Sequence, residues 1–563
     1  MSRGWLVSFL ASRVKRENPV SAEGRSPGEK QDQVKKVETL HPVNRFSGVV
    51  IQRALSRCLG AFTALALLLC LSCGKRPDSN TVVVIIENSP VNLDPRVGTD
   101  AQSELIDELI FDSLVRKDQH FNIQPSVAER WETPDPQTYV FHLRQGIHFH
   151  DGRPLTAKDV KWTLDTMRNG TLITLKGATY KLVDRIEAAG DFTLTIHLTE
   201  PFSPLLWNLT DGALGIVPYG SGKDFNRAPI GSGPFRLVRS IPDSEVILEC
   251  NNAYWGDHPR IERVRFNVVP DTTTRALELR KGSADIAINS LTPDTVGTLQ
   301  HQSNLRVLRH PGTSLAYLAF NLRDPILKDA KVRQALAYAI DRGPMLHYLF
   351  RDFGRLADSI LPPEHWAYNA DVVHYPSDPA KANALLDSAG YPRGKNGIRF
   401  QLTMKTGTEE TTRLIAAVLQ QQLRSVGIAL DIRSFEFPTF YSDVLKGAFQ
   451  LYSLRWVGYS NQDPDIFDDA FHSASFPPKR ANRGHYCNPE MDRLIEEGRR
   501  TVDQQKRKQI YGEVQSILAR DLPYINLWYM DNIIVHSARV QDLRLGPSAD
   551  YNFLTTLSLA PVK

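Results

Sequence analysis

Residues 138–164 read TYVFHLRQGIHFHDGRPLTAKDVKWTL, a stretch in which an alternating pattern gives way to a turn and then to a helical pattern. At its start, Tyr139, Phe141 and Leu143 occupy every second position, so one face of an extended segment is apolar throughout. Successive side chains of a strand point to opposite faces, and an apolar face of this kind packs on a core. The pattern predicts a half-buried strand.

The residues that follow contain a turn and the start of a helix. Asp151, Gly152 and Pro154 favour a turn and end the strand pattern. Thr156 stands where an N-cap would, and Asp159 follows three residues later. At this spacing the two side chains can satisfy backbone N–H groups at the start of a helix. A capped helix is therefore expected directly after the turn.

Length and charge limit the number of domains and the class of partner. At 563 residues and 42% hydrophobic content, the chain is too long for one core and predicts two or three packed units. The formal net charge is +4, but residues 1–73 hold 11 Lys or Arg and 5 Asp or Glu, which leaves −2 for the rest. Without that segment there is no electrostatic case for nucleic-acid binding.

A secretory signal is predicted at residues 49–73. Arg53 and Arg57 precede an apolar run, residues 59–71, and small residues follow it. This is the charged, apolar and small-residue order of a signal peptide, and the run is short for a membrane-spanning helix. We therefore expect an exported protein.

The end of this signal looks like a lipobox, the site at which a lipoprotein is acylated and cut. It reads Leu71-Ser-Cys-Gly74, with Cys73 as the predicted lipidated residue and Cys70 where leucine is usual. The two cysteines also form a CxxC motif, but inside a signal's apolar core we favour the lipobox over a redox or metal site. Residues 1–48 are interpreted as a disordered extension or a mis-assigned start, and residues 74–80 as a tether.

The chain after the tether divides into two patterned halves. Residues 81–310, which begin with the β-branched run 81–86, mix strand and helix patterns and predict a first lobe with an inserted subdomain. The pattern restarts at residue 311, and residues 311–525 predict a second lobe. The strand pattern at 523–529 is interpreted as crossing back, so that residues 526–563 return to the first lobe.

The second half contains a strand–helix–strand pattern. Residues 400–404 and 428–432 are strand-like, and residues 413–426 between them are amphipathic with a glycine directly after. This order predicts a βαβ unit with parallel strands and an α/β fold class of mixed α+β lobes.

Cys250 and Cys487 are the two cysteines outside the signal region. They could pair in an oxidising compartment, but sequence does not give their separation in space. Two unconnected and mostly buried thiols are expected.

Residues 138–164 resemble, nearly residue for residue, the signature of the family 5 extracytoplasmic solute-binding proteins, the dipeptide, oligopeptide and nickel-chelate receptors of ABC importers. The resemblance extends over residues 81–560 as an ordered set of short motifs, each weak alone. Those motifs include Gly231-Ser-Gly-Pro-Phe235, Asn252-Ala-Tyr-Trp-Gly256, Val269-Pro-Asp271, Gly282-Ser-Ala-Asp-Ile286, Lys331-Val-Arg-Gln-Ala-Leu336 and Leu522-Pro-Tyr-Ile-Asn-Leu-Trp528.

The resemblance implies a two-lobed periplasmic-binding-protein-like fold of type II, with hinge strands and an extra subdomain in the first lobe. It implies a monomer that encloses a small solute or peptide between its lobes and delivers it to a membrane permease. No catalysis and no cofactor are implied. Together with the signal, it indicates a protein of the periplasm or cell envelope, held to the membrane by lipid.

The resemblance also indicates a ligand cleft. In peptide-binding members an acidic residue four positions before the proline of an acidic-Pro pair holds the peptide's α-amine, and here that position is Ser460 before Asp463-Pro464. Serine cannot neutralise an ammonium, which weakens a simple dipeptide interpretation. Trp456 matches a family aromatic that could stack on ligand, or it could be core. The remaining predicted cleft residues are Asn92, Leu93 and Asn461.

Several histidines and aspartates allow other interpretations of the protein's function. His142, His148 and His150 could bind a metal, but no third ligand pattern supports a metal site. Histidines that satisfy hydrogen bonds in turns are the favoured interpretation. Asp463 and Asp465 could be a general acid/base pair, although Asp-Pro-Asp is more often a turn with capping carboxylates. The rival functions are a nickel-chelate or haem receptor of the same fold and an exported hydrolase that uses Ser460 or the aspartate pair.

Overall fold

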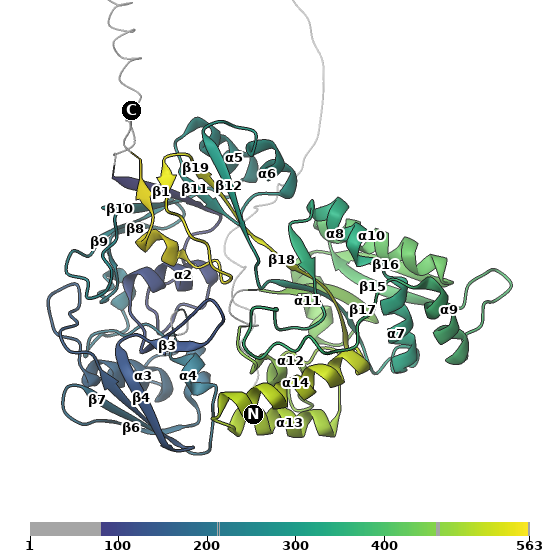
Figure 1. Cartoon of the computed structure of the whole chain (residues 1–563), viewed down its shortest axis with the longest axis horizontal. Coiled ribbons are helices and arrows are strands. Elements are labelled where there is room, and N and C mark those ends of the chain that lie inside the picture. The colour runs from purple at the N-terminus through teal and green to yellow at the C-terminus, as the bar shows by residue number, and fades with distance from the viewer. Residues whose placement is uncertain (1–79, 211, 213, 458–461, 561–563) are drawn as a thin grey trace, which may run out of the picture. The chain divides into compact units, whose positions relative to one another are not determined.

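A computed structural model describes residues 80–210, 212, 214–457 and 462–560 of the chain. The predicted extension, the signal with Cys73 and most of the tether lie outside these residues. Within them, two large sheets and a smaller one carry most of the fold (Figure 1).

A seven-stranded sheet in the order β12-β19-β11-β1-β10-β9-β8 is built from both ends of the described chain. Its strands are β12 (Leu305–His310), β19 (Asn532–Ser537), β11 (Ile286–Ile288), β1 (Thr81–Ile86), β10 (Arg263–Val268), β9 (Glu245–Cys250) and β8 (Phe235–Ile241). The neighbours of β1 on both sides, β10 and β11, run parallel to it.

Strand β1 has the bounds that the β-branched run predicts, and all of its residues are buried. Val82 and Val84 pack in the core that holds α2 (Ala101–Ile110), and Val83 packs with α5 (Thr272–Lys281) and α6 (Pro293–Leu299). A strand with helices on both faces has no polar side, which explains the continuous apolar run.

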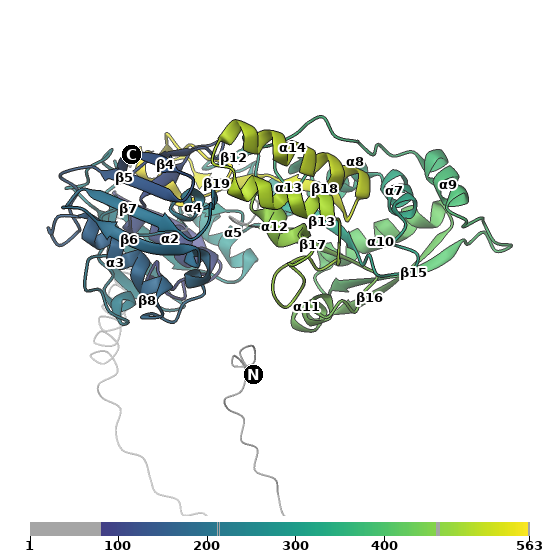
Figure 2. The same ribbon diagram turned by 90° about the horizontal axis from the view of Figure 1, so that it is seen from below.

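A four-stranded sheet in the order β4-β5-β7-β6 forms a subdomain with its own core (Figure 2). Its elements are β4 (Ala128–Asp135), β5 (Thr138–Leu143), α3 (Ala157–Arg168), β6 (Val183–Ala188), β7 (Thr193–Leu198) and α4 (Leu205–Asn208). In β5 the apolar positions are buried in alternation, as predicted. Thr156 is the N-cap of α3, and its backbone N–H donates to Asp159 Oδ2 at 2.8 Å.

A six-stranded sheet in the order β14-β18-β13-β17-β15-β16 is the centre of the second half. Its strands are β14 (Gly354–Leu356), β18 (Tyr524–Met530), β13 (Leu315–Phe320), β17 (Leu451–Trp456), β15 (Phe400–Gly407) and β16 (Ile428–Phe435). Strands β15 and β16 are parallel and joined by α10 (Glu410–Ser425), so the predicted βαβ unit is confirmed.

Helices cover both faces of this sheet. One core contains side chains of α7 (Ala330–Ala339), α8 (Arg342–Phe350), α9 (Pro379–Ser388) and α10. The other core contains side chains of α11 (Phe437–Leu445), α12 (Ile466–Phe471), α13 (Pro489–Arg500) and α14 (Gln504–Asp521). Helices α13 and α14 lie side by side in both views (Figures 1 and 2).

Short elements complete the fold. They are the pairs β2 (Val115–Lys117) with β3 (Ile123–Pro125) and β20 (Val540–Gln541) with β21 (Ser558–Leu559), and 3-10 turns at Lys176–Tyr180, Phe225–Arg227 and Tyr551–Thr555. We call the seven- and four-stranded sheets with their helices the first lobe, and the six-stranded sheet with its helices the second lobe.

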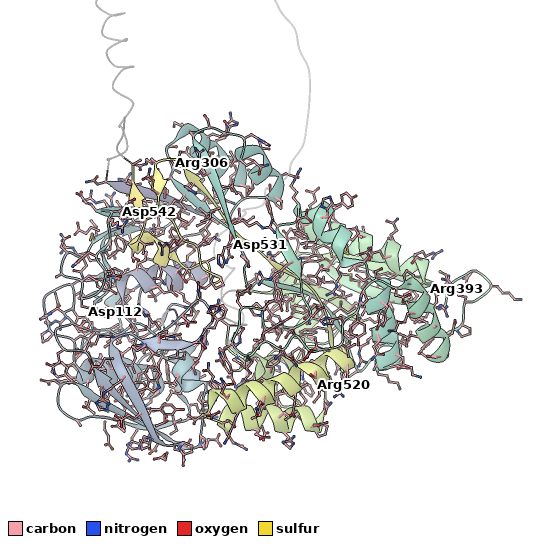
Figure 3. The ribbon with its side chains drawn as sticks, viewed as in Figure 1. Asp112, Arg306, Arg393, Arg520, Asp531 and Asp542 are labelled. Carbon is pink, nitrogen blue, oxygen red and sulfur yellow. The ribbon has the colours of Figure 1, made fainter. Side chains whose placement is uncertain are left out.

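Two neighbouring segments join the lobes. The first connects β12 to β13, and the second connects β18 to β19 at Asp531, which Figure 3 labels. Met530 N–H donates to Ser314 O at 2.8 Å across the two segments, and Arg309 forms an ion pair with Asp531. Such a pair of adjacent crossings has the geometry of a hinge.

The crossing back comes later than the sequence analysis expects. Strand β18 pairs with β13 and β14 as far as Met530, so residues 523–529 remain in the second lobe's sheet. The segment then crosses at Asp531, and β19 pairs with β11 and β12. An apolar strand pattern does not tell which sheet a strand joins, because both sheets bury both of their faces.

Both cysteines of the described chain are free thiols. The expectation that they are unconnected is confirmed, but Cys487 is exposed, so the expectation of mostly buried thiols is wrong for it. Within the described ranges no helix is long and apolar enough to cross a membrane.

Candidate functional site

Trp456 is the last residue of β17, at the end of the sheet that adjoins the hinge. Its partner in β13 is Leu315, and Ser314 Oγ donates to Trp456 O at 3.3 Å. The side chain is 7% exposed, and the Tyr317 ring stacks with it at 6.1 Å between centroids. The Trp456 ring therefore both fills the core and borders the hinge.

A cluster of aromatic rings surrounds this tryptophan on the α11–α14 face of the sheet. Tyr317 of β13 stacks on Tyr524 of β18 at 4.4 Å and meets the edge of Tyr452 of β17 at 6.1 Å. Burial raises the pKa of all three phenols, so they are neutral hydroxyls that can donate or accept hydrogen bonds.

The Arg483 guanidinium lies over this cluster. Its carbon is 5.2 Å from the Trp456 ring centroid and 5.6 Å from that of Tyr441 in α11. It donates to Tyr441 Oη at 3.1 Å and to Tyr317 Oη at 3.4 Å. Cation–π contact and these hydrogen bonds hold a positive charge beside Trp456.

Asp463 stabilises the turn that leads into α12. Its Oδ1 accepts a hydrogen bond from Asp465 N–H at 2.8 Å, and Arg507 Nη2 lies 3.9 Å away. The side chain is buried, which raises its pKa despite the nearby arginine. Of the residues predicted around it, Ser460 and Asn461 lie outside the described part of the chain.

Asp465 faces a different arginine from Asp463. Arg499 Nε is 2.7 Å from Asp465 Oδ1, and Arg499 Nη1 is 3.2 Å from Asp468 Oδ2. Burial raises the pKa of Asp465 to about 6, and Arg499 opposes that rise. Each aspartate of the Asp-Pro-Asp turn is engaged with its own arginine, so the geometry fits a turn better than an acid/base pair. Among the described residues, only Asp463 accepts a backbone N–H in that turn, since the side chain of Asp465, the N-cap of α12, makes no capping hydrogen bond.

Asn92 and Leu93 lie in a loop of the first lobe. Leu93 is 4% exposed and packs in the core of the seven-stranded sheet. Asn92 Oδ1 accepts from Asp94 N–H at 2.9 Å, and Ser103 Oγ accepts from Asn92 N–H at 3.0 Å. Among the described residues, no recorded contact joins this loop to Trp456 or Asp463, so their common role in a cleft stays a prediction.

The three histidines of the opening stretch are engaged separately. His142 Nε2 is 3.0 Å from Glu132 Oε1, and His148 Nδ1 is 2.9 Å from Gly146 O. His150 is neutral because burial lowers its pKa to about 4, and its Nε2 donates to Gly233 O at 3.1 Å. In the described ranges, no group of three or more His, Cys, Asp or Glu side chains is arranged to hold a metal.

One group of contacts between the lobes lies at the ends of α13 and α14. Ser203 N–H donates to Arg499 O at 2.8 Å, and Gln504 Nε2 donates to Asn122 Oδ1 at 3.0 Å. The rings of Phe121 and His365 stack at 5.5 Å. These contacts lie beside the Asp-Pro-Asp turn, since His365 Nε2 donates to Gln462 O at 3.1 Å.

An open groove of about 570 Å³ lies elsewhere, along α14. Its lining includes Tyr368, Asn369, Lys508, Glu513 and Arg520, all from the second lobe. None of the predicted ligand residues lines it. A solute enclosed between lobes must contact both of them, so this groove does not have the geometry of the cleft.

Sequence reasoning missed Arg483, Tyr441, Arg507 and His365. No local signal marks them, because each is one polar or aromatic residue in a loop or on a helix. Their importance depends on partners distant in the sequence, which only the fold brings near.

The family model described as "Bacterial extracellular solute-binding proteins, family 5 Middle" matches residues 122–477. The chain belongs to this family. This solute-binding protein is 27% identical over 495 residues to the dipeptide-binding protein of Escherichia coli K12. The aligned part covers 83% of this chain and 91% of that protein.

A second relative of this solute-binding protein is a probable di/tripeptide-binding protein of Pseudomonas aeruginosa UCBPP-PA14. It is 30% identical over 458 residues, covering 77% of this chain and 86% of that protein. Among solved structures, the oligopeptide-binding protein AppA of Bacillus subtilis with a nonapeptide superposes with a TM-score of 0.68. It is 26% identical and covers 85% of this chain and 99% of that one. The predicted two-lobed fold is confirmed.

Proposed function

We propose that this protein is the receptor of an ABC importer and binds a peptide or a similarly sized polar solute between its lobes. The family match carries this proposal, because it covers most of both lobes. The names of relatives that bind dipeptides and oligopeptides favour a peptide ligand. The adjacent crossing segments supply the hinge that such a receptor needs, and ligand would favour closure through contacts made in the closed state.

The bound solute leaves chemically unchanged in this proposal. The rival, an exported hydrolase, would need Ser460 or the Asp463–Asp465 pair as its catalytic group. Each aspartate faces its own arginine, which does not favour proton transfer between them. Steady release of a hydrolysed peptide, lost in Ser460→Ala, would support the hydrolase and contradict the receptor.

The proposed cleft contains the Asn92-Leu93 loop, Trp456, Ser460, Asn461 and Asp463. Trp456 and Asp463 flank the segment that holds Ser460 and Asn461, and both are anchored by buried contacts. We propose lobe boundaries near residues 311 and 531, where the two crossing segments lie.

The membrane attachment is proposed from the sequence. Lipid on Cys73, after export and removal of the signal, would hold a monomeric receptor next to its permease in the periplasm or cell envelope. Mass spectrometry of the protein from its own host checks this. We expect Cys73 to be the N-terminal residue and to carry lipid, and we expect this lipid to be lost in Cys73→Ser. Peptides from residues 1–48 would contradict the interpretation that the start of the chain is mis-assigned.

Native mass spectrometry of protein purified without added ligand tests the receptor function. We expect a co-purifying solute with the mass of a small peptide, and a rise in Tm when dipeptides or tripeptides are added to stripped protein. A ligand that binds only the folded state raises Tm as its concentration exceeds Kd. No mass adduct, and an unchanged Tm across a broad panel of peptides, would contradict the peptide proposal.

A further inference from the structure

Arg483 is a half-buried cation without a carboxylate partner. It is packed over Trp456 and Tyr441, and the structure records no ion pair for it among the described residues. Its Nε is buried and has no hydrogen-bond partner there, while its other donors reach only the hydroxyls of Tyr317 and Tyr441. A buried cation of this kind is usually paired, because its desolvation is costly.

The neighbouring described segments form no ion pair with Arg483. Asp469 is close enough to feel the charge of Arg483, but its recorded ion pair is with Arg480, at 3.9 Å. Residues 457–462, which follow Trp456, read Val-Gly-Tyr-Ser-Asn-Gln and contain no Asp or Glu. Whatever path residues 458–461 take, this segment offers Arg483 no carboxylate.

Further hydrogen-bond donors gather beside Arg483. Trp456 is only 7% exposed, and its indole N–H is buried without a hydrogen-bond partner among the described residues. Tyr441 Oη accepts from Arg483, which leaves its own proton free to be donated. Buried donors without acceptors are rare in folded proteins, and among the described residues these donors have no acceptor.

We infer that Arg483, Trp456 and Tyr441 form a carboxylate-binding subsite, and that the ligand is anchored by an anionic group rather than by its ammonium. This inference rests on the proposed receptor function and adds the charge of the ligand to it. A guanidinium offers paired N–H donors that match a carboxylate, and the indole and phenol donors complete its hydrogen bonds. Ser460, in place of an acid, agrees with a subsite built for negative charge.

Three forms of dialanine separate the two modes of anchoring. H-Ala-Ala-OH carries both charges, Ac-Ala-Ala-OH carries only the carboxylate, and H-Ala-Ala-NH2 carries only the ammonium. Calorimetric titration of the exported protein, stripped of co-purified solute, should give similar Kd values for the two carboxylates. The amide should bind at least tenfold more weakly.

Substitution of the arginine then tests its role directly. Arg483→Gln should weaken binding of Ac-Ala-Ala-OH at least tenfold and abolish the preference over the amide. Arg433→Gln is the matched control, because Arg433 is also in the second lobe and its side chain is 60% exposed. It should leave all three Kd values unchanged. Should Arg483→Gln fail to fold, Trp456→Phe keeps an aromatic ring but removes the indole N–H with its five-membered ring, and it should weaken binding of both carboxylate probes.

The outcomes separate this inference from the function on which it rests. A Kd for Ac-Ala-Ala-OH that stays within twofold in Arg483→Gln, equal binding of all three probes, or tighter binding of the amide would each overturn the carboxylate subsite and leave the receptor function standing. If none of the probes binds while other peptides do, the subsite does not recognise a terminal carboxylate and the inference is wrong. If no peptide binds at all, the peptide function and the inference fail together.

Discussion

At the scale of single residues, His365 is the clearest case of a side chain whose protonation is set by its position between the lobes. Its Nδ1 accepts from Ala367 N–H at 3.0 Å, its Nε2 donates to Gln462 O, and its ring stacks on Phe121. It is 3% exposed, and burial lowers its pKa to about 3. The buried ring is therefore neutral, with both nitrogens in use.

This histidine predicts a loss of stability in mild acid. The unfolded chain binds a proton near the ordinary histidine pKa of about 6.5, and the folded chain does not, so stability falls as the pH drops below that value. Between pH 7 and pH 5, His365 should cost about 2 kcal/mol of the free energy of unfolding. His365→Phe keeps a ring beside Phe121 and should lose correspondingly less over this range.

Urea unfolding at both pH values measures the effect. His148→Phe is the control, since His148 is exposed, and its pH dependence should match that of the unmodified protein. Equal losses in His365→Phe and the unmodified protein would show that His365 does not resist protonation.

At the scale of elements, the loop Gly231-Ser-Gly-Pro234 packs against the end of α2. A Cβ on Gly231 would lie 1.8 Å from Ile110 O, and one on Gly233 would lie 2.7 Å from Ile110 C. Gly233 N–H donates to Ile110 O at 2.9 Å, and His150 N–H donates to Gly231 O at 2.8 Å. The two glycines allow the loop to join the seven-stranded sheet to the subdomain at van der Waals distance.

Gly231→Ala should therefore destabilise the first lobe, because the new methyl group forces the loop away from backbone atoms that cannot yield. We expect a loss of at least about 2 kcal/mol in the free energy of unfolding, within the range of overpacked sites. Gly222→Ala is the matched control, since a Cβ there meets nothing within 4 Å. Equal stability of the two variants in urea titration would contradict the close contact.

At the scale of the whole molecule, the lobes are joined by the hinge and by contacts beside the Asp-Pro-Asp turn, at the ends of α13 and α14. Ser203 Oγ donates to Arg499 O at 3.1 Å, and Arg499 lies over the Phe202 ring at 5.2 Å. The same arginine pairs with Asp465. The turn that follows the predicted ligand segment is thus tied to the surface where the lobes meet, which can couple ligand contact to closure.

Removing contacts between the lobes should weaken ligand binding without touching the ligand. Ser203→Ala combined with Gln504→Ala deletes side-chain hydrogen bonds between the lobes, each worth about 0.5–1.5 kcal/mol. The closed state becomes less populated, so the Kd for dialanine should rise about threefold or more. Titration calorimetry gives the Kd, and X-ray scattering should show a larger radius of gyration with ligand below saturation.

Arg433→Gln again serves as the control and should leave both measurements unchanged. An unaltered Kd in the double variant would mean that the contacts between the lobes contribute nothing to the closed state.

Local chemistry was enough to predict much of the fold. The bounds of β1, the cap of α3 at Thr156 and the parallel pair β15–β16 follow from periodicity, capping residues and element order. These signals act over a few residues or between neighbouring elements, so the amino-acid sequence contains them without the tertiary structure. The family resemblance came from short motifs of the same kind.

The tertiary structure alone decided which distant residues meet. It seats Leu93 in the first lobe's core, brings Arg483 over Trp456, stacks Phe121 on His365 and keeps residues 523–529 in the second sheet. Contacts of this kind depend on how sheets and helices pack, and the same apolar or polar side chain suits many such arrangements. The sequence by itself therefore determined the elements and the family, whereas the packing of the two lobes determined the surroundings of the candidate site.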